Sequence, residues 1–151
     1  MTPYIRGIAA LLACALSAAC CPSWAQVAVP APSAVAPKYR VVMQVSNADP
    51  RGWNQALSNS LALTKNAGRA NVEIRIVAIG GGIGMLKENS PAAKLVAAVL
   101  GQGVQVLACG ETMKALLLEK DDLLPNVAVV PGGLIEVLDR QSEGWHYIKA
   151  D

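Results

Sequence analysis

The stretch Val72-Glu-Ile-Arg-Ile-Val-Ala-Ile79 decides the fold class of this 151-residue chain. Its second half is apolar at every position, so both faces of the extended chain would be buried. That pattern is typical of a parallel strand with helices on both sides. Gly80-Gly-Gly-Ile-Gly84 follows directly and breaks the strand, which predicts a flexible loop at its carboxyl end.

Strands and helices alternate on either side of this stretch. Upstream, Tyr39–Ser46 is a β-rich apolar run, and Asp49-Pro50 then supplies an N-cap and a first-turn proline for a helix that ends at Gly68. Downstream, we expect strands over 104–108, 127–130 and 145–149, and helices over 90–101, 111–120 and 134–140. In the helix over 111–120, Met113, Leu116 and Leu117 should face inward. This alternation predicts a three-layer α/β/α fold with about five mainly parallel strands.

Residues 1–25 predict a cleaved signal peptide. Arg6 supplies a positive charge, an uncharged apolar run follows from Gly7 to Cys21, and Ser23 and Ala25 are the small residues before the cleavage point. The run is shorter than the ~20 apolar residues that a membrane-spanning helix needs. We therefore expect a periplasmic or secreted protein with no membrane span after cleavage.

Cysteine counting gives Cys109 special weight. The other three cysteines, Cys14, Cys20 and Cys21, lie inside the predicted signal peptide, so the mature chain can form no intramolecular disulfide. A lone thiol in an oxidising compartment is open to oxidation unless it is buried. A lipoprotein with its lipid on Cys14 or Cys20 is an alternative to a soluble mature form, and the sequence leaves that choice open.

Residues 26–37 are rich in proline and alanine and carry no charge, which predicts an extended linker before a domain over 38–151. Loss of residues 1–25 removes Arg6 and no acid, so 12 of the 13 basic residues remain against 11 acidic ones. A near-neutral chain gives no electrostatic reason to expect nucleic acid or an anionic membrane as a partner.

Cys109 is the candidate catalytic residue. It follows the predicted strand over 104–108, and chemistry in open parallel sheets gathers at the carboxyl ends of the strands. Gly110 and the start of a helix come next, and free N–H groups there would stabilise a thiolate and lower its pKa. A small, inert core cysteine is the alternative, and position alone does not decide between the two.

Five further residues are candidates for substrate binding at the same edge of the sheet. The glycine cluster matches neither a dinucleotide-binding fingerprint nor a phosphate loop, so we interpret it as a loop lining the strand-end cleft. Glu111 and Thr112 could contact a ligand, although helix-start residues often have these types. The candidates are Gly81, Gly82, Gly110, Glu111 and Thr112.

His146 is the single histidine of the chain. A Cys–His pair could activate the thiol, but His146 lies within the last predicted strand, where a surface position is the simpler interpretation. One histidine and one cysteine cannot form a His/Cys metal site within a single chain, so we expect no metal and no cofactor.

The segment Val106-Leu-Ala-Cys109-Gly-Glu-Thr-Met113, followed by Asp122-Leu-Leu-Pro125 and the tail over 129–148, resembles the DsrE/DsrF-like family. So does the opening strand followed by Trp53-Asn-Gln-Ala-Leu57, and the resemblance covers residues 39–150. It implies a five-stranded α/β fold and homo-oligomers, often trimers or hexamers. Sulfur-relay members of that family carry a persulfide on a cysteine and pass sulfane sulfur between proteins. Cys109 matches the place of that cysteine.

This resemblance leads to a functional hypothesis. We expect an exported protein that binds or relays sulfane sulfur as a persulfide on Cys109, with a sulfur donor or acceptor protein as partner. The relay members are cytoplasmic, so predicted export sets this chain apart from them. Two alternatives stay open: a non-catalytic homo-oligomeric module that binds a small ligand, and a redox-responsive thiol protein.

Overall fold

The computed structural model describes residues 36–150, so the predicted signal peptide and most of the predicted linker lie outside the described residues. Its centre is one five-stranded sheet in the order β4-β3-β2-β1-β5, and every neighbouring pair is parallel. The strands are β1 (Tyr39–Val45), β2 (Val72–Ala78), β3 (Gln105–Cys109), β4 (Ala128–Val130) and β5 (His146–Ala150). The predicted α/β class is confirmed.

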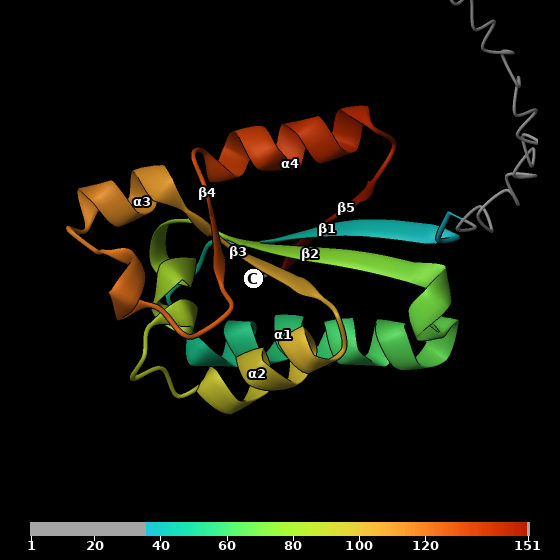
Figure 1. Cartoon of the computed structure of the whole chain (residues 1–151), viewed down its shortest axis with the longest axis horizontal. Coiled ribbons are helices and arrows are strands. Elements are labelled where there is room, and N and C mark those ends of the chain that lie inside the picture. Colours follow the sequence, from blue (N-terminus) through green and yellow to red (C-terminus); the bar gives the residue numbers. More distant parts are fainter. Residues whose placement is uncertain (1–35, 151) are drawn as a thin grey trace, which may run out of the picture. The chain divides into compact units, whose positions relative to one another are not determined.

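Helices lie on both faces of this sheet and form the outer layers (Figure 1). Helices α1 (Pro50–Ala67) and α2 (Ala93–Gly101) cover one face, and α4 (Gly133–Ser142) covers the other. The short helix α3 (Gly110–Ala115) begins where β3 ends, and three 3-10 segments complete the chain: η1 (Arg69–Asn71), η2 (Gly80–Leu86) and η3 (Lys120–Asp122). None of the described helices has the length and apolar character needed to cross a membrane.

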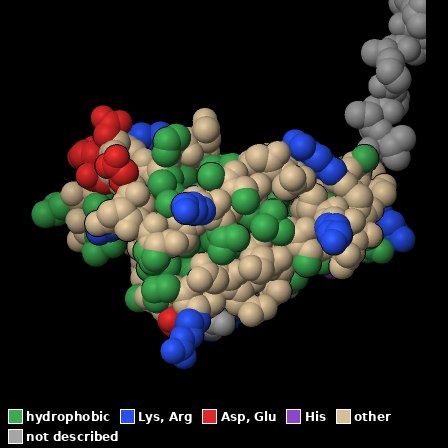
Figure 2. All heavy atoms as spheres, turned by 90° about the horizontal axis from the view of Figure 1, so that it is seen from below, with side chains coloured by type: hydrophobic (Ala, Val, Ile, Leu, Met, Phe, Trp, Pro, Cys, Tyr) green, Lys and Arg blue, Asp and Glu red, His purple; other side chains and the backbone are tan. Residues whose placement is uncertain are grey.

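The two faces of the sheet bury cores of unequal size. The larger core lies between the sheet and the α1/α2 layer, and Met43, Leu57, Ile76 and Val96 are fully or almost fully buried within it. The smaller core lies beneath α4 and consists of Val42, Val77, Leu107, Val137 and Trp145. Figure 2 views the molecule from the α1/α2 side, where most Lys and Arg side chains stand apart from one another and the acidic side chains gather mainly at one end. Burial on both faces is the main force that holds β2 in the centre of the sheet.

Local signals at α1 act as the sequence predicts. The side chain of Asp49 caps the helix by accepting the Arg51 amide at 3.0 Å, and Pro50 occupies the first turn. The helix ends at Gly68, whose φ of +84° is readily available only to glycine. These signals set the point at which the chain turns back toward β2.

The glycine cluster is an ordered 3-10 segment, and the prediction of a flexible loop there is wrong. A Cβ on Gly82 would collide with the carbonyl oxygen of Val45, and one on Gly84 would lie 2.7 Å from the Trp53 ring. Ile83, Met85 and Leu86 are fully buried. The glycines therefore allow η2 to pack tightly against the end of β1 and the start of α1.

The helix after Cys109 is shorter than predicted, because it ends at Ala115 instead of residue 120. Leu117 has a φ of +54°, and the Leu118 amide donates to the Met113 carbonyl at 2.9 Å, which closes the helix. Met113 is buried as predicted, but Leu116 is half exposed and Leu117 is 90% exposed. The prediction that Leu116 and Leu117 face inward is therefore wrong, because the backbone reverses before another helical turn forms.

Candidate functional site

Cys109 stands at the junction of two elements, as the last residue of β3 and the N-cap residue of α3. Its Sγ accepts a hydrogen bond from the Gly133 amide at 3.2 Å. Gly133 is the first residue of α4, which follows the neighbouring strand β4. The sulfur therefore lies between the starts of α3 and α4, at the carboxyl edge of the sheet.

Two glycines make this close approach possible. A Cβ on Gly133 would lie 2.9 Å from the Cβ of Cys109 and 2.7 Å from Cγ1 of Ile79. A Cβ on Gly110 would lie 3.0 Å from the Val130 carbonyl oxygen. Sequence reasoning missed Gly133, although Pro131-Gly-Gly133 after the fourth predicted strand marks a turn at the same sheet edge.

The pKa of Cys109 is lowered from the ordinary value of a thiol. Burial raises the pKa, since it disfavours the charged form. Hydrogen bonding from the Thr112 side chain, and from the amides of Thr112, Gly133 and Glu111, lowers the pKa by more. The sulfur makes no regular N-cap hydrogen bond, so the bond from Gly133 is the well-formed amide contact. The site thus favours a thiolate, the reactive form of cysteine.

The thiol of Cys109 is free and almost enclosed, with the residue only 4% exposed. Two shallow hollows flank it at the surface. One, of about 550 Å³, is lined by Gly80, Gly81, Glu111, Thr112, Ala115 and Leu116. The other, of about 420 Å³, is lined by Gly110, Met113, Lys114, Leu117, Leu118, Glu119 and Val129. Cys109 lines neither hollow, in agreement with its burial.

The predicted binding residues divide between these places. Gly81, Glu111 and Thr112 share the first hollow, and Gly110 lines the second. Gly82 is buried against β1, where close packing accounts for the glycine. The Glu111 carboxylate pairs with Lys114 at 2.8 Å, and both side chains are largely exposed.

His146 lies far from the thiol. It is the first residue of β5, pairs with Val41 near the start of β1, and is exposed. Cys109 ends β3, which is separated from β5 by both β2 and β1. A Cys–His pair does not form within the chain. Across residues 36–150, no three His, Cys, Asp or Glu side chains gather in a way that could hold a metal ion.

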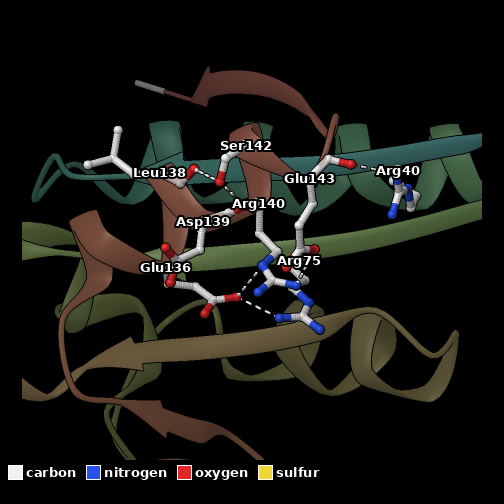
Figure 3. A network of polar contacts seen from close by, with 8 residues as sticks. All are labelled: Arg40, Arg75, Glu136, Leu138, Asp139, Arg140, Ser142 and Glu143. Atoms are coloured by element: carbon white, nitrogen blue, oxygen red, sulfur yellow. Dashed lines mark hydrogen bonds and ion pairs between the residues drawn. The ribbon is translucent and has the colours of Figure 1, made fainter.

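A cluster of charged side chains fastens α4 to the sheet (Figure 3). The Glu136 carboxylate accepts a hydrogen bond from the Arg75 guanidinium at 2.5 Å and forms an ion pair with Arg140 at 3.3 Å. The guanidinium groups of Arg75 and Arg140 lie 5.1 and 5.8 Å from the centre of the buried Trp145 ring, within cation–π range. Since the cluster fixes α4 on β2, it also fixes the first residue of that helix, Gly133, against the thiol.

Comparison with known proteins agrees with this architecture. The protein MTH1491 from Methanobacterium thermoautotrophicum, of unknown function, is 35% identical over 74% of this chain and 98% of its own, with a TM-score of 0.70. Two structures share the fold at 15% identity. BT1422 from Bacteroides thetaiotaomicron, a conserved protein of unknown function, has a TM-score of 0.59 over 73% of this chain and 93% of its own. The ychN protein from E. coli has a TM-score of 0.60 over 75% of this chain and 98% of its own.

None of the curated proteins matches the chain. The DsrE/DsrF-like family does match, over residues 39–150, a range that begins with β1 and ends with β5. All five strands and the junction that carries Cys109 fall inside that range, and the protein therefore belongs to the DsrE/DsrF-like family.

Proposed function

We propose that this protein binds sulfane sulfur as a persulfide on Cys109 and relays it to an acceptor protein. One observation carries the proposal: the Cys109 sulfur accepts the first amide of α4 at a strand end where its pKa is lowered. Membership of the DsrE/DsrF-like family supplies the sulfur chemistry. The predicted signal peptide supports a periplasmic or secreted place of action.

The chemistry follows from the thiolate. Cys109 attacks the outer sulfur of a polysulfide, a new S–S bond forms, and the S–S bond within the donor breaks. The electron pair of the broken bond leaves with the shortened polysulfide, so Cys109 gains one sulfur atom as a persulfide. An acceptor thiolate then attacks the outer sulfur of that persulfide, and the Cys109 thiolate is released unchanged.

The test is the intact mass of the full chain after incubation with polysulfide. We expect the wild type to gain mass in steps of one sulfur atom at Cys109, and the Cys109→Ser variant to lack that gain. Because the full chain also contains Cys14, Cys20 and Cys21, peptide mapping assigns the sulfur to its position. A wild-type protein without added sulfur on Cys109 contradicts the proposal.

The two alternatives predict different results. A non-catalytic binding module would bind its small ligand with the same affinity after Cys109→Ser. A redox-responsive thiol protein would form a dimer through an intermolecular disulfide at Cys109. The dimer would be seen on a non-reducing gel and would be lost after addition of a reducing agent.

We also propose that the protein forms a homo-oligomer through the outer side of α4. Leu134, Ile135 and Leu138 are each about 60% exposed, whereas Val137 of the same helix is buried against the sheet. Three large apolar side chains on one short helix are typical of a protein–protein contact. The family resemblance makes a trimer or a hexamer the expected assembly.

A further inference from the structure

The glycine cluster has a hydrogen bond to the helix that begins at the thiol. The Gly80 amide donates to Oγ1 of Thr112 at 3.1 Å, across 32 residues of sequence. A threonine hydroxyl that accepts one N–H keeps its own hydrogen to donate elsewhere. The Thr112 hydroxyl is therefore available as a donor, with its oxygen already held in place.

The position of Thr112 in α3 brings that donor within reach of Cys109. Thr112 is the third residue of the helix and Cys109 is its N-cap residue. In the capping box, a Glu or Gln side chain at this third position bonds back to the N-cap residue, so a side chain placed there has the N-cap residue within reach. Thr112 is also the side chain whose hydrogen bonding favours the Cys109 thiolate.

The Gly80 amide is held by the packing of its loop. A Cβ on Gly81 would lie 2.8 Å from the Ala48 amide, which shows how closely this loop lies against the chain after β1. The Ile79 amide donates to the Val45 carbonyl at 2.9 Å, and the Gly82 amide donates to the Ile79 carbonyl at 3.0 Å. Gly80 therefore presents its N–H from a position fixed by β1.

We propose that Thr112 is a positioning residue for the thiol: the Gly80 amide holds its hydroxyl oxygen, and the hydroxyl hydrogen is donated to Sγ of Cys109. The Gly133 amide donates to the same sulfur from α4. The thiolate thus receives donors from elements that follow two different strands. This inference deepens the proposed function and rests on it for the biological use of the thiolate, while the contacts themselves do not depend on sulfur transfer.

The inference assigns a role to the glycine cluster that no phosphate-binding template provides. Gly81 and Gly82 allow the chain to approach β1 closely, and this approach brings the Gly80 amide within hydrogen-bond distance of the Thr112 hydroxyl. The cluster then acts through Thr112 on the reactivity of Cys109. It does not need to touch the sulfur donor.

The experiment compares Thr112→Val, which removes the hydroxyl at nearly constant shape, with Thr112→Ser, which keeps it. The alkylation rate of Cys109 in the full chain is measured against pH with iodoacetamide, and the Cys109 peptide is followed by mass spectrometry. We expect Thr112→Val to move the midpoint of the profile upward by about one pH unit, as loss of one charge-assisted hydrogen bond would. Thr112→Ser should restore a midpoint close to that of the wild type.

A purely structural role for Thr112 would lower stability or change the plateau rate without moving the midpoint, and an unmoved midpoint overturns the inference. An equal shift in Thr112→Val and Thr112→Ser also overturns it, since the hydroxyl would then be irrelevant. If Thr112→Val does not fold, Thr112→Ala gives the same readout. Sulfur loading of the wild type is scored separately, and its absence overturns the proposed function without bearing on the pH midpoint.

Discussion

At the scale of single residues, the protonation of Cys109 links its surroundings to the stability of the fold. Its pKa is lowered in the folded chain by hydrogen bonds that outweigh burial, and these bonds are lost on unfolding. Between the lowered pKa and the ordinary thiol pKa, the folded state has lost the proton that the unfolded state still holds. The free energy of unfolding must therefore rise with pH across this interval.

Urea unfolding of the wild type and of Cys109→Ser at a series of pH values measures this effect. We expect the stability difference between wild type and variant to grow in favour of the wild type as pH rises from the lowered pKa to the ordinary value, and to stay constant above it. Below the lowered pKa the thiol contribution should be absent. A difference that does not vary with pH would contradict the lowered pKa.

Gly133 is the second residue whose replacement is informative. Gly133→Ala would place a Cβ within 3 Å of both Cys109 and Ile79, so the start of α4 must move away from the sulfur. We expect a loss of about 1–3 kcal/mol in the free energy of unfolding, the usual cost of overpacking. We also expect a higher pH midpoint for alkylation of Cys109, because the Gly133 amide no longer reaches Sγ.

Gly101→Ala is the matched control for this substitution. Gly101 ends α2, and a Cβ there would meet nothing within 4 Å. The control should leave the alkylation midpoint unchanged and alter stability by less than about 1 kcal/mol, with a small gain expected from the reduced freedom of the unfolded chain. Equal effects of the two substitutions would show that the close approach at Gly133 is unimportant.

At the scale of elements, α4 depends on the charged cluster beneath it. Glu136 joins Arg75 of β2 to Arg140 of α4, and all three side chains are mostly buried. Glu136→Gln would leave the guanidinium of Arg75 without its carboxylate partner, while Arg140 would keep its ion pair with Glu143. We expect a loss of about 1–3 kcal/mol in the free energy of unfolding, as for other buried charge-assisted hydrogen bonds.

Glu111→Gln makes the same chemical change in an exposed pair. Glu111 and Lys114 lie on the surface of α3, and such pairs contribute about 0–1 kcal/mol. Chemical denaturation of both variants measures the two losses, and hydrogen exchange in α4 should rise only in Glu136→Gln. Equal losses in the two variants would contradict the anchoring role of the cluster.

The order of the elements could be predicted from the sequence because local signals set it. The apolar run before Gly80 identified a central parallel strand, and Asp49, Pro50 and Gly68 set both ends of α1. The end of α3 could not be found in this way, because Leu116 and Leu117 continue an apolar helical pattern. What ends that helix is the left-handed backbone at Leu117, which no glycine or asparagine marks in the sequence.

The candidate site was predictable only in part, for a similar reason. The placement of Cys109 at a strand end follows from the strand-to-helix pattern around it. The Gly133 amide reaches the sulfur only because β4 lies beside β3 and α4 turns back over the sheet, and no sequence spacing shows that pairing. The bond from Gly80 to Thr112 likewise depends on how η2 packs against β1.

At the scale of the whole molecule, the exposed apolar side of α4 is the contact through which we expect the protein to assemble. We expect the wild type to sediment as a trimer or a hexamer at micromolar concentration. Leu138→Glu should shift it to a smaller species, because a charge would have to be buried in the contact. Analytical ultracentrifugation measures both masses.

Ser58→Glu serves as the control, since Ser58 is exposed on α1, which covers the opposite face of the sheet. It should leave the assembly unchanged. A wild-type monomer, or a loss of assembly in the control alone, would contradict a contact through α4.

The hydrogen bond between Cys109 and Gly133 spans 24 residues, and this separation has a consequence for the order of folding. A chain that has formed β3 but has not yet docked β4 and α4 carries a thiol without this donor. The pKa of its cysteine is then closer to that of an ordinary thiol, because one of the hydrogen bonds that lower it is missing. The full reactivity of the thiol arises only when residues 128–142 have docked on the sheet, so the thiol is less reactive while the protein folds than once folding is complete.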